Sequence, residues 1–183
     1  MIDTIIYKIK KMKTLRTIIV CIFLISFSGC DKNESEDLNN LDVDSYIELL
    51  KEGKYDSFEL PEFTYKDIPA LLEYRNEIQI IKDFPINGIS SLWLPECKLG
   101  TYVLWTIESI RAVAIDSEYL IGRFPSQNPI VQKREDPFEI ENRKKVHEII
   151  SKSYYDWWEN NKRKEFNEFK QIDPLINTEY RWH

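Results

Sequence analysis

Histidine, glycine and cysteine, on which many catalytic and metal-binding motifs depend, are scarce in this sequence of 183 residues. It has two histidines, five glycines and three cysteines. We find no Gly-rich phosphate loop, no nucleophile elbow, no paired-histidine zinc helix and no cysteine pair at metal-ligand spacing. His147 is predicted on a polar helix face and His183 is at the chain terminus, and neither has a ligand cluster beside it in the sequence. The sequence therefore predicts a non-enzymatic protein that needs no cofactor and no metal.

A hydrophobic run long enough to cross a membrane is also missing. The apolar run Ile18–Phe27 has about half of the roughly 20 residues that a spanning helix needs. Basic residues precede this run, and the small pair Ser28–Gly29 separates it from Cys30. This order is typical of a signal peptide that is removed, so we predict that residues 1–29 are cut off. The true start is open between Met1 and Met12, because a complete basic segment already follows Met12.

The four residues Phe27–Cys30 resemble the bacterial lipobox, in which the cysteine is linked to diacylglycerol before cleavage. The resemblance implies a lipid on Cys30 that holds the protein at a membrane. Residues 30–40 are acidic and lack apolar periodicity, which predicts a flexible tether before a single domain at 41–183. Acidic residues after the lipidated cysteine resemble a surface-export signal of certain gut Gram-negative anaerobes. They imply an outer-membrane lipoprotein facing the cell surface, with the periplasmic face as the alternative.

The charge of the mature part argues against nucleic acid as a partner. The chain has a formal charge of −6, and the segment Met1–Gly29 carries five basic residues against Asp3 alone, a charge of +4. Removal of this segment leaves −10 on the mature part. Such a surface repels a phosphate backbone, so we expect no nucleic-acid binding.

Helical patterns dominate the mature part. The ranges predicted as helical are Tyr46–Glu52, Ala70–Arg75, Glu96–Ile115 and Glu139–Asn161, with one further turn at Glu165–Phe169. Gly53 is the predicted C-terminal stop of the first of these helices. The range Glu96–Ile115 is apolar nearly all round, which predicts a buried central helix. Ile78–Ile81 fits either a last helical turn or a short strand, and Gly122–Pro137 is predicted to be a long surface loop.

The fold class predicted from these patterns is mainly α. No turn of the Asn-Gly kind separates two alternating runs, so no β-hairpin is indicated. Asp67–Leu72 followed by Leu104–Ile110 resembles a HEAT-type helical hairpin. We therefore expect a compact helical domain with HEAT-like hairpins around the central apolar helix.

Two charged residues interrupt the predicted central helix. Glu108 and Arg111 are three positions apart, so their side chains can pair on one face. Ionised groups on an apolar helix need partners or a wet cavity, so the pair marks either a structural ion pair or a pocket. A hydrolase that uses Glu108 is an alternative, and it requires a second acid in the same cleft.

Aromatic residues gather near the C-terminus. In the predicted helix, Trp157 shares the core stripe with Tyr154, whereas Tyr155 and Trp158 lie on its flank. Exposed aromatic rings can stack on sugars or anchor partner proteins, so Tyr155, Trp158 and the terminal Trp182 are candidate binding residues. The alternative is that these rings only cover the edge of the core.

Four phrases of the sequence, Tyr46–Lys51, Phe63–Leu72, Leu104–Arg111 and Tyr155–Asn161, resemble a family of small secreted proteins from gut anaerobes. The family is known only as a domain of unknown function. The similarity spans most of 41–183 and implies a shared fold and a cell-envelope setting, but it transfers no functional residues.

Together these observations predict a lipid-anchored protein of the cell envelope without enzymatic activity. We interpret it as a protein-interaction module. A surface glycan-binding accessory protein and the Glu108 hydrolase are the alternatives.

Overall fold

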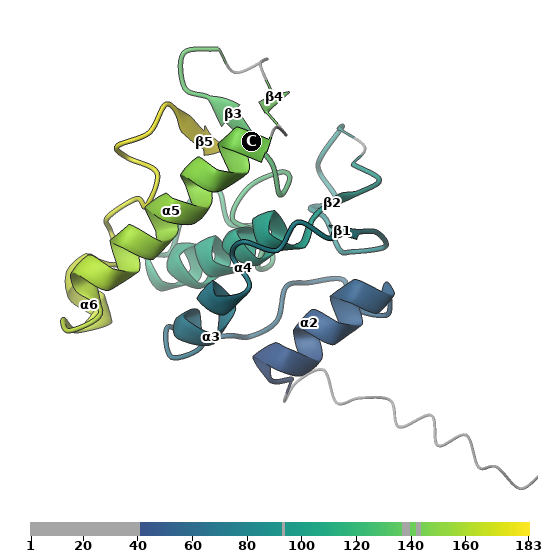
Figure 1. Ribbon diagram of the computed structural model, residues 1–183, viewed down its shortest axis with the longest axis horizontal. Helices are drawn as coiled ribbons and strands as arrows, with labels where there is room; N and C mark the ends of the chain where they lie inside the picture. The colour runs from purple at the N-terminus through teal and green to yellow at the C-terminus, as the bar shows by residue number, and fades with distance from the viewer. Residues whose placement is uncertain (1–40, 93, 137–139, 142–143) are drawn as a thin grey trace, which may run out of the picture. The chain divides into compact units, whose positions relative to one another are not determined.

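The structure is a computed structural model, and it describes residues 41–183 apart from 93, 137–139 and 142–143 (Figure 1). The helices of this part are α2 Val43–Glu52, α3 Ile68–Glu73, α4 Leu99–Ala114, α5 Lys144–Asn161 and α6 Phe166–Phe169. Its strands are β1 Ile80–Ile81, β2 Cys97–Lys98, β3 Val131–Lys133, β4 Ile140–Glu141 and β5 Tyr180–Trp182. All of these helices and strands belong to one compact unit, Asp37–His183. Along this described part, no helix combines the length and the apolar composition that a membrane crossing would need.

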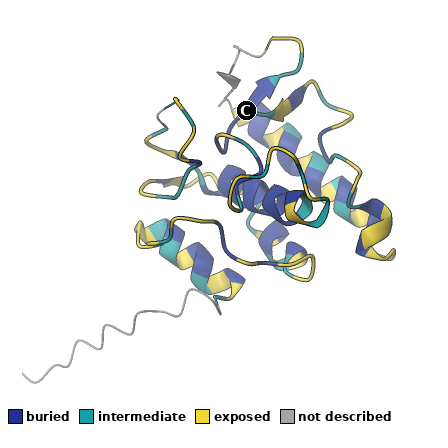
Figure 2. Ribbon diagram, turned by 180° about the vertical axis from the view of Figure 1, so that it is seen from behind, coloured by how far each residue is buried: buried dark blue, intermediate teal, exposed yellow. Residues whose placement is uncertain are grey.

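Helix α4 occupies the centre of the fold, where the sequence predicted a buried helix. Every residue from Leu99 to Ile110 is buried, and α4 packs against both α3 and α5 (Figures 1 and 2). The helix begins at Leu99, and not at Glu96 as predicted, because Cys97–Lys98 pairs with β1 as a strand. The first backbone N–H groups of α4 donate to carbonyls of the segment before β1, at 2.8 Å to Gln79 and 2.9 Å to Glu77.

Gly100 allows the close approach of α4 to its neighbours. A Cβ atom at this position would lie 2.6 Å from the carbonyl oxygen of Arg75 and 2.8 Å from Cε1 of His147. A side chain here would collide with backbone, so the helix needs glycine despite its low helix propensity.

The ends of α2 and α5 differ from the sequence-based expectation. The N-cap of α2 is Asp42, whose side chain accepts from the backbone N–H of Ser45 at 2.8 Å, and α2 starts three residues earlier than predicted. Its C-terminal stop at Gly53 is confirmed, with a left-handed φ of 64°. Helix α5 begins at Lys144 and not at Glu139.

His147 was placed on a polar helix face by the sequence, and this prediction is wrong. Its side chain is 4% exposed, and Nδ1 lies 2.9 Å from Oγ1 of Thr101 on α4. Burial, followed by the charge of Lys98, lowers the pKa of His147. The ring is therefore part of the contact between α4 and α5.

The mainly α, HEAT-like fold class is also wrong, because the described part is a mixed α/β structure with two small antiparallel sheets. One sheet pairs β1 with β2, and the other has the order β4-β3-β5. Each strand is two or three residues long. Such short runs cannot show the alternation by which strands are recognised, and β3 pairs with β5 from far along the chain.

The predicted surface loop Gly122–Pro137 is likewise not a surface loop. It contains β3, and Phe124, Ile130 and Val131 are buried in the core or against it. The backbone pairing extends beyond β5, since the N–H of His183 donates to the carbonyl of Ile130 at 3.0 Å. The segment lies against α4, since Ser126 accepts from Trp105 Nε1 at 2.8 Å.

Candidate functional site

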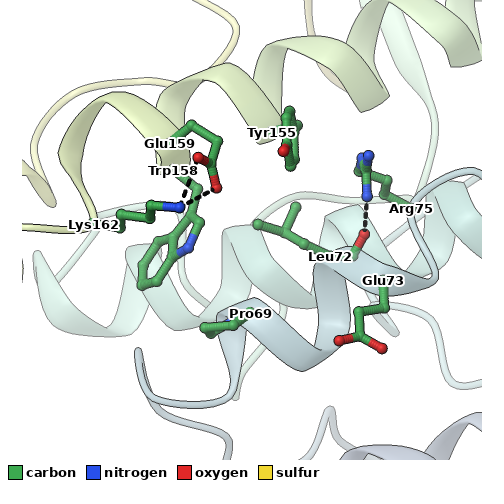
Figure 3. A pocket seen from close by; sticks show the side chains of 8 residues that line it. All are labelled: Pro69, Leu72, Glu73, Arg75, Tyr155, Trp158, Glu159 and Lys162. Carbon is green, nitrogen blue, oxygen red and sulfur yellow. Dashed lines mark hydrogen bonds and ion pairs between the residues drawn. The ribbon is translucent and has the colours of Figure 1, made fainter.

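Two cavities contain the candidate residues, and the first lies between α3 and α5. We call it the α3–α5 groove. It has a volume of about 400 Å³ and is lined by Pro69, Leu72, Glu73, Arg75, Tyr155, Trp158, Glu159 and Lys162 (Figure 3). The lining residues belong to α3 and α5, except Arg75 and Lys162, which lie within two residues of the ends of these helices, so helix packing positions most of the side chains.

The aromatic wall of the groove comes from α5. Tyr155 is 39% exposed and Trp158 is half-buried, while Tyr154 and Trp157 point into the core. Trp158 packs edge-on against Phe169 with the ring centroids 6.1 Å apart. As the helical spacing predicted, Tyr154 and Trp157 are buried, whereas Tyr155 and Trp158 lie on the flank of the helix.

The rim of the groove carries charges of both signs. The guanidinium of Arg75 lies over the Tyr155 ring at 4.2 Å from its centroid, and its Nη1 donates to the Leu72 carbonyl at 2.6 Å. On the other wall Lys162 pairs with Glu159 at 2.7 Å. The result is an apolar floor between polar edges (Figure 3).

The second cavity, which we call the α4–β5 pocket, has a volume of about 580 Å³. Its walls come from one side of α4, from β3 and β5, from the C-terminus and from segments around 87–89, 118–127 and 173–175. Residues far apart in sequence therefore meet here, held by the pairing of β3 with β5.

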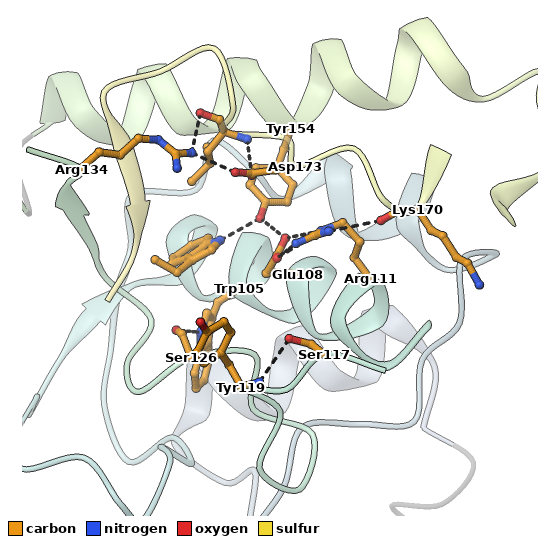
Figure 4. Close-up of polar contacts among 12 residues, drawn as sticks. Trp105, Glu108, Arg111, Ser117, Tyr119, Ser126, Arg134, Tyr154, Lys170 and Asp173 are labelled. Atoms are coloured by element: carbon orange, nitrogen blue, oxygen red, sulfur yellow. Dashed lines mark hydrogen bonds and ion pairs between the residues drawn. The ribbon is translucent and has the colours of Figure 1, made fainter. Parts of the chain in front are cut away.

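Glu108 and Arg111 form a buried ion pair on the wall of this pocket (Figure 4). Arg111 Nε donates to both carboxylate oxygens of Glu108 at 3.1 Å, Nη2 donates to Oε1, and Nη1 donates to the carbonyl of Lys170 at 3.2 Å. The Tyr154 hydroxyl donates to Oε2 at 2.7 Å, and it accepts from Trp182 Nε1 at 2.8 Å. The network thus links α4 to α5 and β5.

The pKa shifts follow from this burial and pairing. Burial, and then the charge of Glu108, raise the pKa of Tyr154 well above its usual value. For Arg111, burial lowers the pKa, but the charge and hydrogen bonds of Glu108 outweigh it and raise the pKa overall. Arg111 therefore stays charged and Tyr154 stays a hydrogen-bond donor.

The geometry favours a structural role for Glu108 over an acid–base role. Glu108 is 7% exposed, and both of its oxygens already accept from Arg111 or Tyr154. Two other acids line the same pocket: Asp173, which accepts from Arg134 Nη2 at 2.9 Å, and Glu118, which is exposed. A catalytic carboxylate needs an oxygen open to substrate or water, and Glu108, on which the hydrolase alternative depends, offers none.

The structure divides the sequence-based candidates between the two cavities. Tyr155 and Trp158 lie together in the groove, whereas Trp182 lies in the pocket with Glu108 and Arg111. Cys30, the candidate for lipidation, lies outside the described residues.

Several residues of both cavities were missed by the sequence analysis. Arg75 was included only as the last residue of a predicted helix, and Lys162 and Asp173 were not among the candidates. No local signal marks Asp173, because its place in the pocket depends on the return of the chain through β5. Arg75 could have been found from its position opposite α5 once α3 and α5 were known to pack on α4.

Metal binding and thiol chemistry have no support in the described part of the chain. No group of three side chains with metal-ligand chemistry lies together there. Cys97 is buried, and burial raises the pKa of its thiol. A thiol in this state is a poor nucleophile.

Comparison with protein families identifies the group to which the chain belongs. The family described as a domain of unknown function (DUF4943) matches residues 37–183, so the chain belongs to this family. The predicted resemblance to a family of unknown function is confirmed, and the lipobox and cell-envelope setting stay predictions. No curated protein and no solved structure matches the chain.

Proposed function

We propose that this member of the DUF4943 family is a non-enzymatic interaction module of the cell envelope. It binds a segment of another envelope protein in the α3–α5 groove and is held at the outer membrane by lipid on Cys30. The observation that carries the proposal is the apolar floor of the groove, with Trp158, Tyr155 and Arg75 beside it.

The residue types in the groove are those on which protein–protein affinity most often depends. Trp, Tyr and Arg are the residues enriched among interface hot spots, and they act best when neighbouring contacts exclude water. Leu72 and Pro69 provide an apolar floor that one large side chain of a partner can cover. The groove volume of about 400 Å³ is within the usual range of binding cavities, about 300–1,000 Å³.

Charges at the rim favour a polypeptide as the occupant. Arg75 and Lys162 carry positive charge, and Glu73 and Glu159 carry negative charge. A peptide with an apolar anchor between charged residues can match both signs, and such matching fixes its direction and register.

Glycan binding at this groove is the second candidate function, supported by the exposure of Tyr155 beside Trp158. Against it, the guanidinium of Arg75 already covers one face of the Tyr155 ring. Sugar stacking needs an open aromatic face, so the groove favours a protein segment over a glycan.

Site-specific photo-cross-linking of the full chain in intact cells tests the interaction. A photoreactive residue replaces Glu73 at the groove rim, and a matched control replaces Glu62, which is exposed outside the groove. We expect one cross-linked envelope protein from position 73 and none from position 62. Trp158→Ala should reduce this product about tenfold, because a hot-spot truncation typically costs more than 1 kcal/mol.

The test requires that Trp158→Ala is folded, which its thermal unfolding curve checks. Arg75→Ala is a second variant, since this side chain lies at the surface of the groove. The same product from positions 62 and 73, or no product in the folded protein, would contradict the proposal.

The anchor has a test of its own. Mass spectrometry of the purified product should show a chain that begins at Cys30 and carries diacylglycerol on its sulfur. An intact leader or a bare Cys30 sulfur would refute the anchor. Protease treatment of intact cells then separates the cell-surface location, in which residues 41–183 are digested, from the periplasmic one.

A further inference from the structure

The α4–β5 pocket has a chemistry different from that of the groove. Two aromatic side chains line it, Trp182 from β5 and Tyr119 from the segment after α4. Trp182 is fixed in position, because its Nε1 donates to the Tyr154 hydroxyl at 2.8 Å and the two rings meet edge to face. Tyr119 is 71% exposed at the rim. The pocket therefore combines one anchored aromatic ring with one accessible ring.

Planar polar side chains accompany these rings. Gln132 lines the pocket from the middle of β3, where it is buried, and Gln127 lines it from the preceding segment. Asp173 and Arg181 provide a carboxylate and a guanidinium. Amide, carboxylate and guanidinium groups each offer two neighbouring donors or acceptors, which suits a ligand with adjacent hydroxyl groups.

Two acids of the pocket are paired within the protein. Glu108, which is buried, is paired with Arg111, and Asp173, which is half-buried, is paired with Arg134 at 2.9 Å. An ionic ligand gains most where a buried charge of opposite sign lacks a partner, and these two pairs provide none. A neutral ligand does not depend on such a charge.

From this combination we infer that the α4–β5 pocket is a binding site for a neutral carbohydrate. A sugar ring has an apolar C–H face, which packs on Trp182, and a rim of hydroxyl groups, which pair with the amides and Asp173. The volume of about 580 Å³ is in the middle of the range for small-ligand sites. The site is separate from the α3–α5 groove, and the inference does not depend on the function proposed for that groove.

Calorimetric titration of the purified full-length protein with neutral gluco-, galacto- and mannodisaccharides tests this inference. We expect at least one of them to bind with a Kd of about 1 mM or tighter. Trp182→Ala and Tyr119→Ala should each weaken binding about tenfold, because each removes an aromatic contact. Trp182→Phe, which keeps a ring but loses the bond to Tyr154, should stay within about threefold of the unsubstituted protein.

Phe58→Ala is the matched aromatic control, since Phe58 is 94% exposed and lines neither cavity. It should leave sugar binding unchanged. Tyr119→Ala alters an exposed side chain, so it keeps the test valid if Trp182→Ala fails to fold. Three results would overturn the inference: no binding of any neutral disaccharide, binding unaffected by Tyr119→Ala, or stronger binding of galacturonic acid than of galactose.

Discussion

The α3–α5 groove and the α4–β5 pocket differ in how the chain builds them. The groove needs only two helices, each of which is continuous in sequence and packs against α4. The pocket needs segments from Asn87 to His183, brought together by the pairing of β3 with β5. The α3–α5 groove therefore depends on helix packing, whereas the α4–β5 pocket depends on a few long-range contacts.

Polar side chains of α4 also make long-range contacts with segments of the pocket wall. Trp105 Nε1 donates to Ser126 Oγ at 2.8 Å (Figure 4). The Ser109 hydroxyl donates to the carbonyl of Arg123. Together with the Glu108–Arg111 pair, they attach the pocket walls to the central helix. Substitutions at these positions should therefore affect the pocket more than the groove.

The largest effect is expected from Trp105→Ala. Trp105 is fully buried and stacks on Phe124 with a centroid distance of 5.4 Å. Loss of this ring leaves a cavity and frees the pocket wall, so the free energy of unfolding should fall by about 3–5 kcal/mol in urea denaturation. Trp105→Phe keeps most of the packing and should cost clearly less. Equal losses for the two variants would mean that the bond to Ser126, and not packing, holds the wall.

A smaller effect is expected when the buried ion pair is broken. Arg111→Met leaves the Glu108 charge buried without its partner, which should cost about 3 kcal/mol of unfolding free energy. The double variant Glu108→Gln/Arg111→Met removes that charge and still offers an acceptor to Tyr154. It should recover part of the loss in urea denaturation. A double variant less stable than Arg111→Met would show that the pair stabilises the fold by more than the relief of a buried charge.

The difference between local and long-range contacts also determines what could be predicted from the sequence. Helical spacing was enough to separate Tyr155 and Trp158 from the core and to pair Glu108 with Arg111, because these relations span three or four residues. The stop of α2 at Gly53 was also a local feature. Local patterns therefore gave the helices and the groove's aromatic wall.

Features that depend on distant parts of the chain could not be predicted in this way. The three residues of β3 have no strand signal of their own, and they become a strand because Tyr180–Trp182 pairs with them. His147 was misplaced because the charged residues around it indicate a wet face, whereas Gly100 lets α4 approach closely enough to bury the ring. The pocket was missed because it is made by such contacts.

The smallest effect is expected for the dependence of stability on pH, which the two histidines determine differently. His147 lies between α4 and α5, whereas His183 lines the α4–β5 pocket. Burial lowers the pKa of His147 in the folded state, so below pH about 6.5 the unfolded chain binds more protons than the folded one. Stability should thus be complete above that pH and decrease as the pH falls through 6.5. The decrease should end once the pH is below the lowered pKa of the folded state.

Urea denaturation of the parent protein and of His147→Gln between pH 7.5 and 5 isolates this contribution, because the carboxylates titrate alike in both. The stability advantage of the parent should shrink as the pH falls. The pKa of His183 is also lowered, first by burial and then by the charge of Arg181, but its side chain is only half-buried. His183→Gln should therefore change the pH profile less than His147→Gln. A larger change for His183→Gln would reverse the comparison, since it would make the pocket, and not the helix contact, the acid-sensitive part of the fold.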